Sequence, residues 1–153
     1  MPTTELVASN AILPALKVNG KKQALQEMSV KAAELTGLNE RAILEILLQR
    51  EKLGSTGVGN GVAIPHGKLA KLNKVFGLFA RLDRPVDFEA LDSQPVDLIF
   101  LLLAPEGAGA DHLKALARVA RLLRDPEVAR KLRSSRDAEA IYAVLALPPA
   151  SAA

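Results

Sequence analysis

The segment at positions 54–68, GSTGVGNGVAIPHGK, shapes the interpretation of the rest of the chain. It contains five of the ten glycines and one of the two histidines. Glycine gives a loop unusual backbone freedom at an entropic cost, so this density indicates more than a simple connection. Residues 62–65 are typical of a short apolar strand, which predicts that His66 stands at a strand end beside unhindered amide groups. Such a place could receive an anion or a phosphoryl group.

Helical and strand patterns occur on both sides of this segment. Before it, apolar residues at three- and four-residue spacing predict a helix over 21–35, and Asn39 is expected to cap a second helix. Three strands are expected after it, at 74–82, 86–88 and 97–104, with Arg84-Pro85 separating the first two. Three helices then follow, one capped by Asp111, one starting at Pro126 and one over 137–147. This order predicts an α/β fold, a single layered domain with a mixed central sheet flanked by helices.

The domain is expected to span 11–147, between a loose lead-in at 1–10 and a disordered tail at 148–153. Pro14 limits the segment 12–18 to an edge strand or an irregular segment, because proline lacks the N–H that a central strand would donate. With 153 residues, 49% of them hydrophobic, the chain can bury a sizeable core as one domain.

Composition argues against several classes of function. There is no cysteine, so thiol chemistry and thiolate metal sites are excluded. The net charge of +3 and only five aromatic side chains, four Phe and one Tyr, do not favour nucleic-acid binding. The longest apolar run, 98–104, is too short to span a bilayer, and the first ten residues do not resemble a secretory signal. We expect a cytoplasmic protein that is not embedded in a membrane and needs no cofactor.

The glycine-rich segment does not match the common nucleotide-binding motifs. Gly61 and Gly67 are separated by five residues instead of four, and Lys68 is followed by leucine, which departs from the P-loop pattern. A dinucleotide fingerprint would need glycine where Val62 stands. No metal site is expected, because neither histidine has a second ligand nearby in the sequence. A serine hydrolase is disfavoured by the absence of a Gly-x-Ser-x-Gly motif.

Histidine itself then remains as a candidate nucleophile. A neutral imidazole can accept a phosphoryl group on one ring nitrogen while the other donates a hydrogen bond. The loop amides and Lys68 could stabilise the added negative charge. The alternative is that His66 merely ends a strand and that the glycines only form turns.

Residues 57–68, GVGNGVAIPHGK, closely resemble the signature of the enzyme IIA domains of the fructose–mannitol class, which belong to the bacterial phosphoenolpyruvate-dependent phosphotransferase system. Similar stretches recur at 82–88, 94–97 and 110–113. The resemblance extends from about Ile12 to Leu147 and is strongest to the nitrogen-regulatory branch, enzyme IIA-Ntr. It implies the enzyme IIA type-2 fold for 11–147.

The resemblance also implies roles for individual residues. His66 would be the phosphoryl acceptor, reacting through Nε2 to form tele-phosphohistidine, with Arg50 and His112 assisting. A phosphate-binding loop is expected from Thr56, Gly59, Asn60, Gly61 and Lys68. From the residues alone, Arg50 could instead be a solvated cation at a helix end, and His112 a histidine without a role in a first helical turn.

A phosphocarrier with a regulatory role is the function that the resemblance favours. The phosphoryl donor would be a phosphorylated HPr-like carrier of the nitrogen branch, and potassium transporters or sensor kinases would be typical regulated targets. The chain has no room for fused transport modules, which favours the regulatory branch. Two alternatives remain open: a sugar-specific enzyme IIA that passes phosphate to an enzyme IIB for fructose- or mannitol-type uptake, and a phospho-independent binding module.

Overall fold

Strand β6 (Val96–Pro105) lies at the centre of the sheet, as its nearly all-apolar sequence predicts. The computed structural model, which describes residues 3–146, places it antiparallel to β5 (Phe76–Val86) on one side. On its other side it runs parallel to β3 (Val62–Ala63) and β4 (His66–Leu69). Every side chain from 98 to 104 is completely buried. Burial of this kind is expected of a strand covered on both faces.

The sheet is mixed, and its strand order is β1-β5-β6-β3-β2, with β4 also pairing with β6. Strand β1 (Val7–Leu16) runs parallel to β5 and forms one edge, which agrees with the restriction that Pro14 imposes. Strand β2 (Gly57–Gly59) is antiparallel to β3 and forms the other edge. The predicted α/β layered fold is therefore confirmed.

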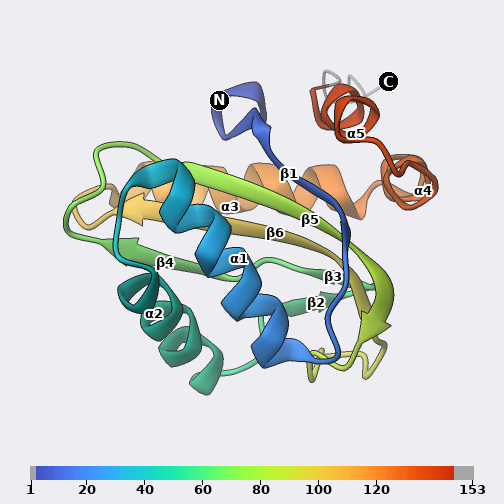
Figure 1. The fold of residues 1–153 in the computed structure, drawn as a ribbon, viewed down its shortest axis with the longest axis horizontal. Helices are drawn as coiled ribbons and strands as arrows, with labels where there is room; N and C mark the ends of the chain where they lie inside the picture. The colour runs from blue at the N-terminus through green and yellow to red at the C-terminus, as the bar shows by residue number, and fades with distance from the viewer. Residues whose placement is uncertain (1–2, 147–153) are drawn as a thin grey trace.

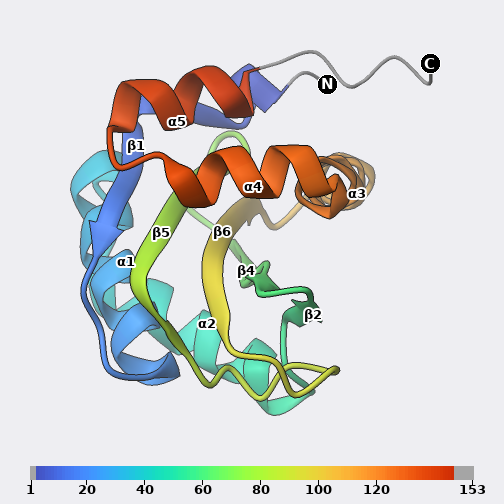
Figure 2. The same cartoon turned by 90° about the vertical axis from the view of Figure 1, so that its right-hand side faces the viewer.

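Helices cover both faces of this sheet (Figure 1). Helices α1 (Lys21–Thr36) and α2 (Glu40–Lys52) pack against each other on one face. Helix α3 (Gly109–Arg124) crosses the opposite face against β6. Helices α4 (Pro126–Ser134) and α5 (Ala138–Leu145) follow it, and α5 reaches back to β1 (Figure 2). A short 3-10 helix (Thr3–Glu5) precedes β1.

The local signals at several helix ends work as predicted. The Asn39 side chain accepts a hydrogen bond from the Ala42 N–H at 3.0 Å and so caps α2. Gly37 ends α1 in the left-handed conformation, at φ 76°, which costs glycine little. Pro126 is the first residue of α4, where its missing N–H has no helical partner to lose.

Two predictions about the strands are wrong. The lead-in at 1–10 is not loose throughout, because β1 begins at Val7 and the side chains of Leu6 and Val7 are buried. Arg84-Pro85 does not separate two strands, since β5 continues through it to Val86. The pairing with β6 shifts register between Arg81 and Val86, so the proline lies where the ladder is already interrupted. Residues 86–88 consequently form no separate strand.

The predicted start of α3 also needs correction. The helix begins at Gly109 after an N-cap at Ala108, and Asp111 lies inside the first turn. A carboxylate there still favours the helix, because it faces the positive end of the helix dipole. The expected tail at 148–153 lies outside the described residues. Within residues 3–146, no helix is both long enough and apolar enough to cross a membrane.

Candidate active site

The glycine-rich segment divides into a hairpin and a separate strand. Residues Gly57 to Ala63 form the β2–β3 hairpin, Ile64 and Pro65 interrupt the pairing, and β4 starts at His66. His66 therefore begins a strand, whereas the sequence predicted that it ends one. The interruption does not detach the chain from β6, because the Pro65 carbonyl still accepts a hydrogen bond from the Leu102 N–H at 2.9 Å.

Both ring nitrogens of His66 have a defined partner. Nδ1 lies 2.8 Å from the Ile64 carbonyl oxygen, which can only accept, so Nδ1 carries the proton. Nε2 lies 3.3 Å from Nε of Arg50, which can only donate, so Nε2 holds the lone pair. The two contacts select the same tautomer, with the proton on Nδ1 and the lone pair on Nε2.

The surroundings of His66 also keep its imidazole neutral. Burial lowers the pKa of His66 below its ordinary value of 6.5, because the charged ring would lose solvation. The Arg50 guanidinium lowers it further, while the Ile64 carbonyl and the Glu51 carboxylate oppose the shift. At neutral pH the imidazole is therefore uncharged, and its Nε2 lone pair faces the Arg50 guanidinium.

Arg50 reaches His66 from the last turn of α2. Its Nη1 donates to the Gly54 carbonyl at 2.9 Å, which holds the guanidinium across the end of the helix. Close approach of α2 to β4 depends on Gly67, because a Cβ atom at that position would overlap Cγ2 of Ile46. Ile46 lies one helical turn before Arg50 on the same face. Gly67 was missed as a site residue, although a glycine inside a strand often marks such a close approach.

His112 lies beside His66 although the two are far apart in the sequence. Their ring centroids are 5.5 Å apart, with planes inclined at 53°. His112 is buried, and its Nδ1 has no hydrogen-bond partner among the described residues. Burial lowers its pKa below 6.5, and His66 and then Lys68 lower it further. Lys68, two residues after His66 on β4, therefore acts electrostatically on this group of side chains.

The other residues of the predicted phosphate-binding loop do not gather at the imidazole. Gly59 pairs with Val62, and Val62 lies opposite Leu98, whereas His66 lies opposite Leu102. Four strand positions correspond to about 13 Å. Asn60 and Gly61 form the hairpin turn beyond Gly59, at φ 57° and 79°. A phosphoryl group on His66 would not reach them.

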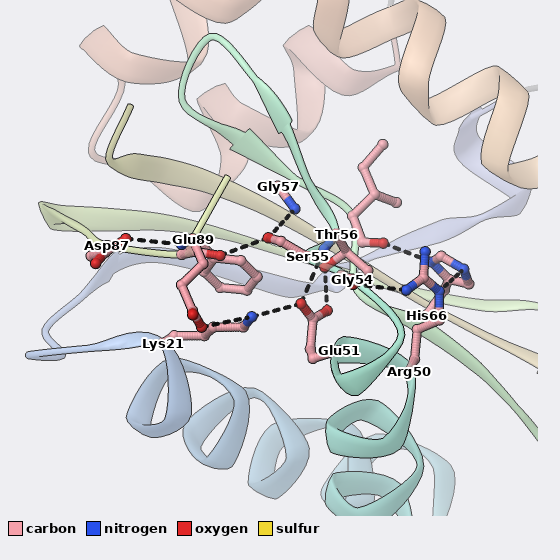
Figure 3. Close-up of polar contacts among 12 residues, drawn as sticks. Lys21, Arg50, Glu51, Gly54, Ser55, Thr56, Gly57, His66, Asp87 and Glu89 are labelled. Carbon is pink, nitrogen blue, oxygen red and sulfur yellow. Dashed lines mark hydrogen bonds and ion pairs between the residues drawn. The ribbon is translucent and has the colours of Figure 1, made fainter. Parts of the chain in front are cut away.

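Thr56 is buried, and both its N–H and its hydroxyl donate hydrogen bonds within the protein. Its N–H donates to Oε1 of Glu51 at 3.0 Å, and its hydroxyl donates to Oε2 of the same carboxylate (Figure 3). Lys21 forms an ion pair with Oε1 of Glu51 at 2.9 Å. The sequence analysis singled out neither Glu51 nor Lys21. For Glu51 the only signal in the sequence is its position next to Arg50.

The structure thus brings together His66, Arg50, His112 and Lys68, from α2, β4 and α3. Among the described residues, no group of three or more His, Cys, Asp or Glu side chains is arranged to hold a metal ion. The arrangement is suited to a nucleophilic imidazole whose added negative charge would meet a guanidinium and an ammonium group.

Residues 5–147 match the family model described as "Phosphoenolpyruvate-dependent sugar phosphotransferase system, EIIA 2". The chain belongs to this family. It is 79% identical over 153 residues to the "Nitrogen regulatory protein" of Bradyrhizobium diazoefficiens, covering all of both chains. It is also 44% identical over 126 residues to the "Nitrogen regulatory protein" of Escherichia coli, covering 82% of this chain and 77% of that protein.

A solved structure supports the same relationship. The crystal structure of Nitrogen Regulatory Protein IIA-Ntr from Neisseria meningitidis matches with a TM-score of 0.87 at 38% identity, covering 92% of this chain and 97% of that one. The IIA mannitol structure from Escherichia coli matches with a TM-score of 0.73 at 24% identity, covering 91% and 97%, which shows the shared fold. The resemblance deduced from the motif is confirmed.

Proposed function

We propose that this protein accepts a phosphoryl group from a phosphorylated HPr-like carrier onto Nε2 of His66 and signals through its phosphorylation state. The observation that carries the proposal is the pair of contacts on the ring, with Ile64 accepting from Nδ1 and Arg50 facing Nε2. A neutral imidazole in a single tautomer is the form that can attack phosphorus.

The transfer proceeds by in-line displacement. The Nε2 lone pair forms a bond to phosphorus as the P–N bond of the donor phosphohistidine breaks, and the electron pair of that bond returns to the donor nitrogen. The His66 ring gains positive charge in this step, and the Ile64 carbonyl stabilises it through the Nδ1–H hydrogen bond. Transfers of this type depend mainly on positioning and on electrostatic stabilisation.

Arg50, His112 and Lys68 have separate roles in this proposal. The Arg50 guanidinium exchanges its contact with Nε2 for the phosphoryl oxygens, to which its charge and planar donors are suited. Lys68 supplies a second positive charge. His112, which is neutral because its pKa is lowered, hydrogen-bonds the phosphoryl group through a ring N–H.

The regulatory role is supported by relatives at 79% and 44% identity, which are named as nitrogen regulatory proteins. We infer that the donor is the HPr-like carrier of the nitrogen branch, in the cytoplasm, and that targets such as potassium transporters or sensor kinases respond to the phosphorylation state. The second candidate is a sugar-specific enzyme IIA. It is favoured by the 36% identity over 146 residues to the fructose-specific EIIABC component of Bacillus subtilis, of which the chain spans 23%.

Radiolabelled phosphoenolpyruvate, with enzyme I and HPr-like carriers of the nitrogen and the sugar branch, tests the proposal. The wild-type protein should become labelled on a histidine, and faster with the nitrogen-branch carrier. His66→Ala should remain unlabelled, while His112→Ala should still accept label because it keeps the acceptor. Circular dichroism of each variant controls for folding. Undiminished labelling of folded His66→Ala would exclude His66 as the acceptor.

A pull-down experiment separates a signalling role from the two alternative functions, a sugar-specific enzyme IIA and a phospho-independent binding module. If the phosphorylation state selects partners, His66→Ala and His66→Asp should retain different sets of proteins. Identical partners and affinities would support a phospho-independent binding module. Passage of label from the wild-type protein to an enzyme IIB would support the sugar-specific role.

A further inference from the structure

The Glu51 carboxylate lies at the centre of a polar network with Lys21 and Thr56, next to Arg50 and His66 (Figure 3). Its side chain is 6% exposed, and both of its oxygens accept hydrogen bonds from Thr56, one from the N–H and one from the hydroxyl. Glu51 follows Arg50 directly on α2, so it ties the end of that helix to the start of the glycine-rich segment. Nothing in the transfer chemistry described above uses this carboxylate.

One path leads from Glu51 to Nε2 of His66. By anchoring Thr56, the carboxylate closes the turn that leaves α2 and so determines where the Gly54 carbonyl lies. That carbonyl accepts a hydrogen bond from Nη1 of Arg50 at 2.9 Å, and Nε of the same guanidinium is 3.3 Å from Nε2 of His66. A shift of the turn would therefore move the cation away from the reacting nitrogen.

A second path leads from Glu51 to Nδ1 of the same ring. The Thr56 carbonyl accepts a hydrogen bond from the Ile64 N–H at 3.0 Å. The Ile64 carbonyl in turn accepts from Nδ1 of His66 at 2.8 Å. The backbone groups of Thr56 and Ile64 thus connect the buried Glu51 carboxylate to the hydrogen bond that selects the tautomer of His66.

Lys21 completes the network from the first residue of α1. Its ammonium group is 2.9 Å from Oε1 of Glu51 and 5.0 Å from the centroid of the Phe88 ring. Its side chain is 17% exposed, so little solvent separates the two charges. A buried carboxylate needs such a cation, because an unpaired charge away from water is strongly unfavourable.

We propose that Glu51, held by Lys21, is a positioning residue for phosphoryl transfer, which acts on both nitrogens of His66 through Arg50 and through Ile64. This inference rests on the proposed function. It assigns to Glu51 no contact with the phosphoryl group. Its effect is on geometry, and a displacement of about 1 Å at a reacting group can slow a reaction by about a hundredfold.

Glu51→Gln tests the inference, because it keeps the shape of the side chain and removes its charge. With saturating phosphorylated carrier, we expect the single-turnover rate of phosphoryl transfer to fall about tenfold or more. The carrier concentration at half-maximal rate should stay unchanged, since Glu51 is buried. Nitrogen-15 NMR of the His66 ring should show the two nitrogen shifts moving towards each other, as the second tautomer becomes populated.

Glu45→Gln is the matched control, because Glu45 is exposed on the same helix. It should change neither the rate nor the ring shifts. Thr56→Val, which removes only the hydroxyl, should shift both measurements in the same direction as Glu51→Gln, and it provides the test if Glu51→Gln does not fold.

Wild-type rate and wild-type ring shifts in the folded variants would overturn the inference, even if the melting temperature fell. The proposed function fails in a different way. If the wild-type protein accepts no label from any carrier, the phosphocarrier role is wrong, while the ring shifts still report whether Glu51 positions the imidazole.

Discussion

Two parts of the glycine-rich segment lie against the same strand, β6, but their polar groups are used differently. One is the hairpin turn at 59–61 and the other is the start of β4 at His66, and we call them the two ends of the motif. At the hairpin turn, the Asn60 N–H donates to Asp92 at 2.9 Å and its carbonyl accepts from Arg133 at 2.7 Å. Arg133 also forms a 3.0 Å ion pair with Asp97 at the start of β6. At the other end, His66 has one contact per ring nitrogen, and His112 leaves a buried Nδ1 without a described partner.

This difference separates a structural end from the end that carries the proposed phosphoryl acceptor. The hairpin turn is held by paired charges and backbone hydrogen bonds that leave little capacity for a ligand. At the imidazole end, Nε2 of His66 accepts only from Arg50, and the neighbouring His112 has a buried Nδ1 without a partner among the described residues, which is costly unless a ligand completes the site. Under the proposed function, one continuous motif serves two purposes about 13 Å apart along β6. Four experiments test this distinction.

The largest contrast is expected between the two arginines. Arg50→Lys should slow phosphoryl transfer by about a hundredfold, because an ammonium group cannot contact His66 and the phosphoryl oxygens with a planar fork. Arg133→Lys, the matched change at the hairpin turn, should leave the transfer rate within about twofold. Single-turnover labelling of both variants measures the contrast. Equal losses would mean that the two ends form one functional site.

The glycines of the two ends should also respond differently. Gly67→Ala should slow transfer by about tenfold, because the added Cβ pushes Ile46, and with it Arg50, away from β4. Combining it with Ile46→Ala should restore part of the rate. Gly61→Ala, at φ 79° and with a Cβ that would overlap Nη2 of Arg133, should instead lower the free energy of unfolding by about 2 kcal/mol without changing the rate. Rates and chemical denaturation of the three variants are the required measurements.

Acidification should affect the two ends in different pH ranges. Since the pKa of His66 is lowered, the transfer rate should be highest in the alkaline range and should fall on acidification with a midpoint below pH 6.5, where Nε2 takes up a proton. Backbone N–H groups of Asn60 and Gln94 lower the pKa of Asp92 below 3.8. The contribution of Asp92 to stability is therefore complete above 3.8 and is lost below it. The rate profile and the pH dependence of unfolding measure the two ranges, with the carrier kept phosphorylated throughout. A midpoint above pH 6.5 would contradict the lowered pKa of His66.

The smallest effect is expected at the tip of the hairpin. Asn60→Ala should lower the free energy of unfolding by about 1 kcal/mol, because alanine tolerates the left-handed conformation less well than asparagine. Asn60→Gly, which accepts this conformation, should cost less. Neither variant should alter phosphoryl transfer. A slower transfer in Asn60→Gly would place the hairpin turn within the functional site.

Local sequence predicted much of the framework and pointed to His66 as the proposed nucleophile. The apolar run at 98–104 predicts a buried central strand because only such a strand is covered on both faces. The caps at Asn39 and Gly37 act over three or four residues, so they can be recognised without tertiary structure. The family signature ending at His66 likewise lies in one continuous stretch.

Other features depended on contacts between residues distant in the chain. Strand β5 continues past Pro85 because β6 accommodates the register shift, and the hairpin residues 59–61 lie away from His66 because β3 and β4 pair with different parts of β6. The tautomer of His66, the approach allowed by Gly67 and the network around Glu51 also required the assembled fold. The sequence alone determined which residues could react. The tertiary structure decided which of them meet, because hydrogen bonds and close packing act in space and not along the chain.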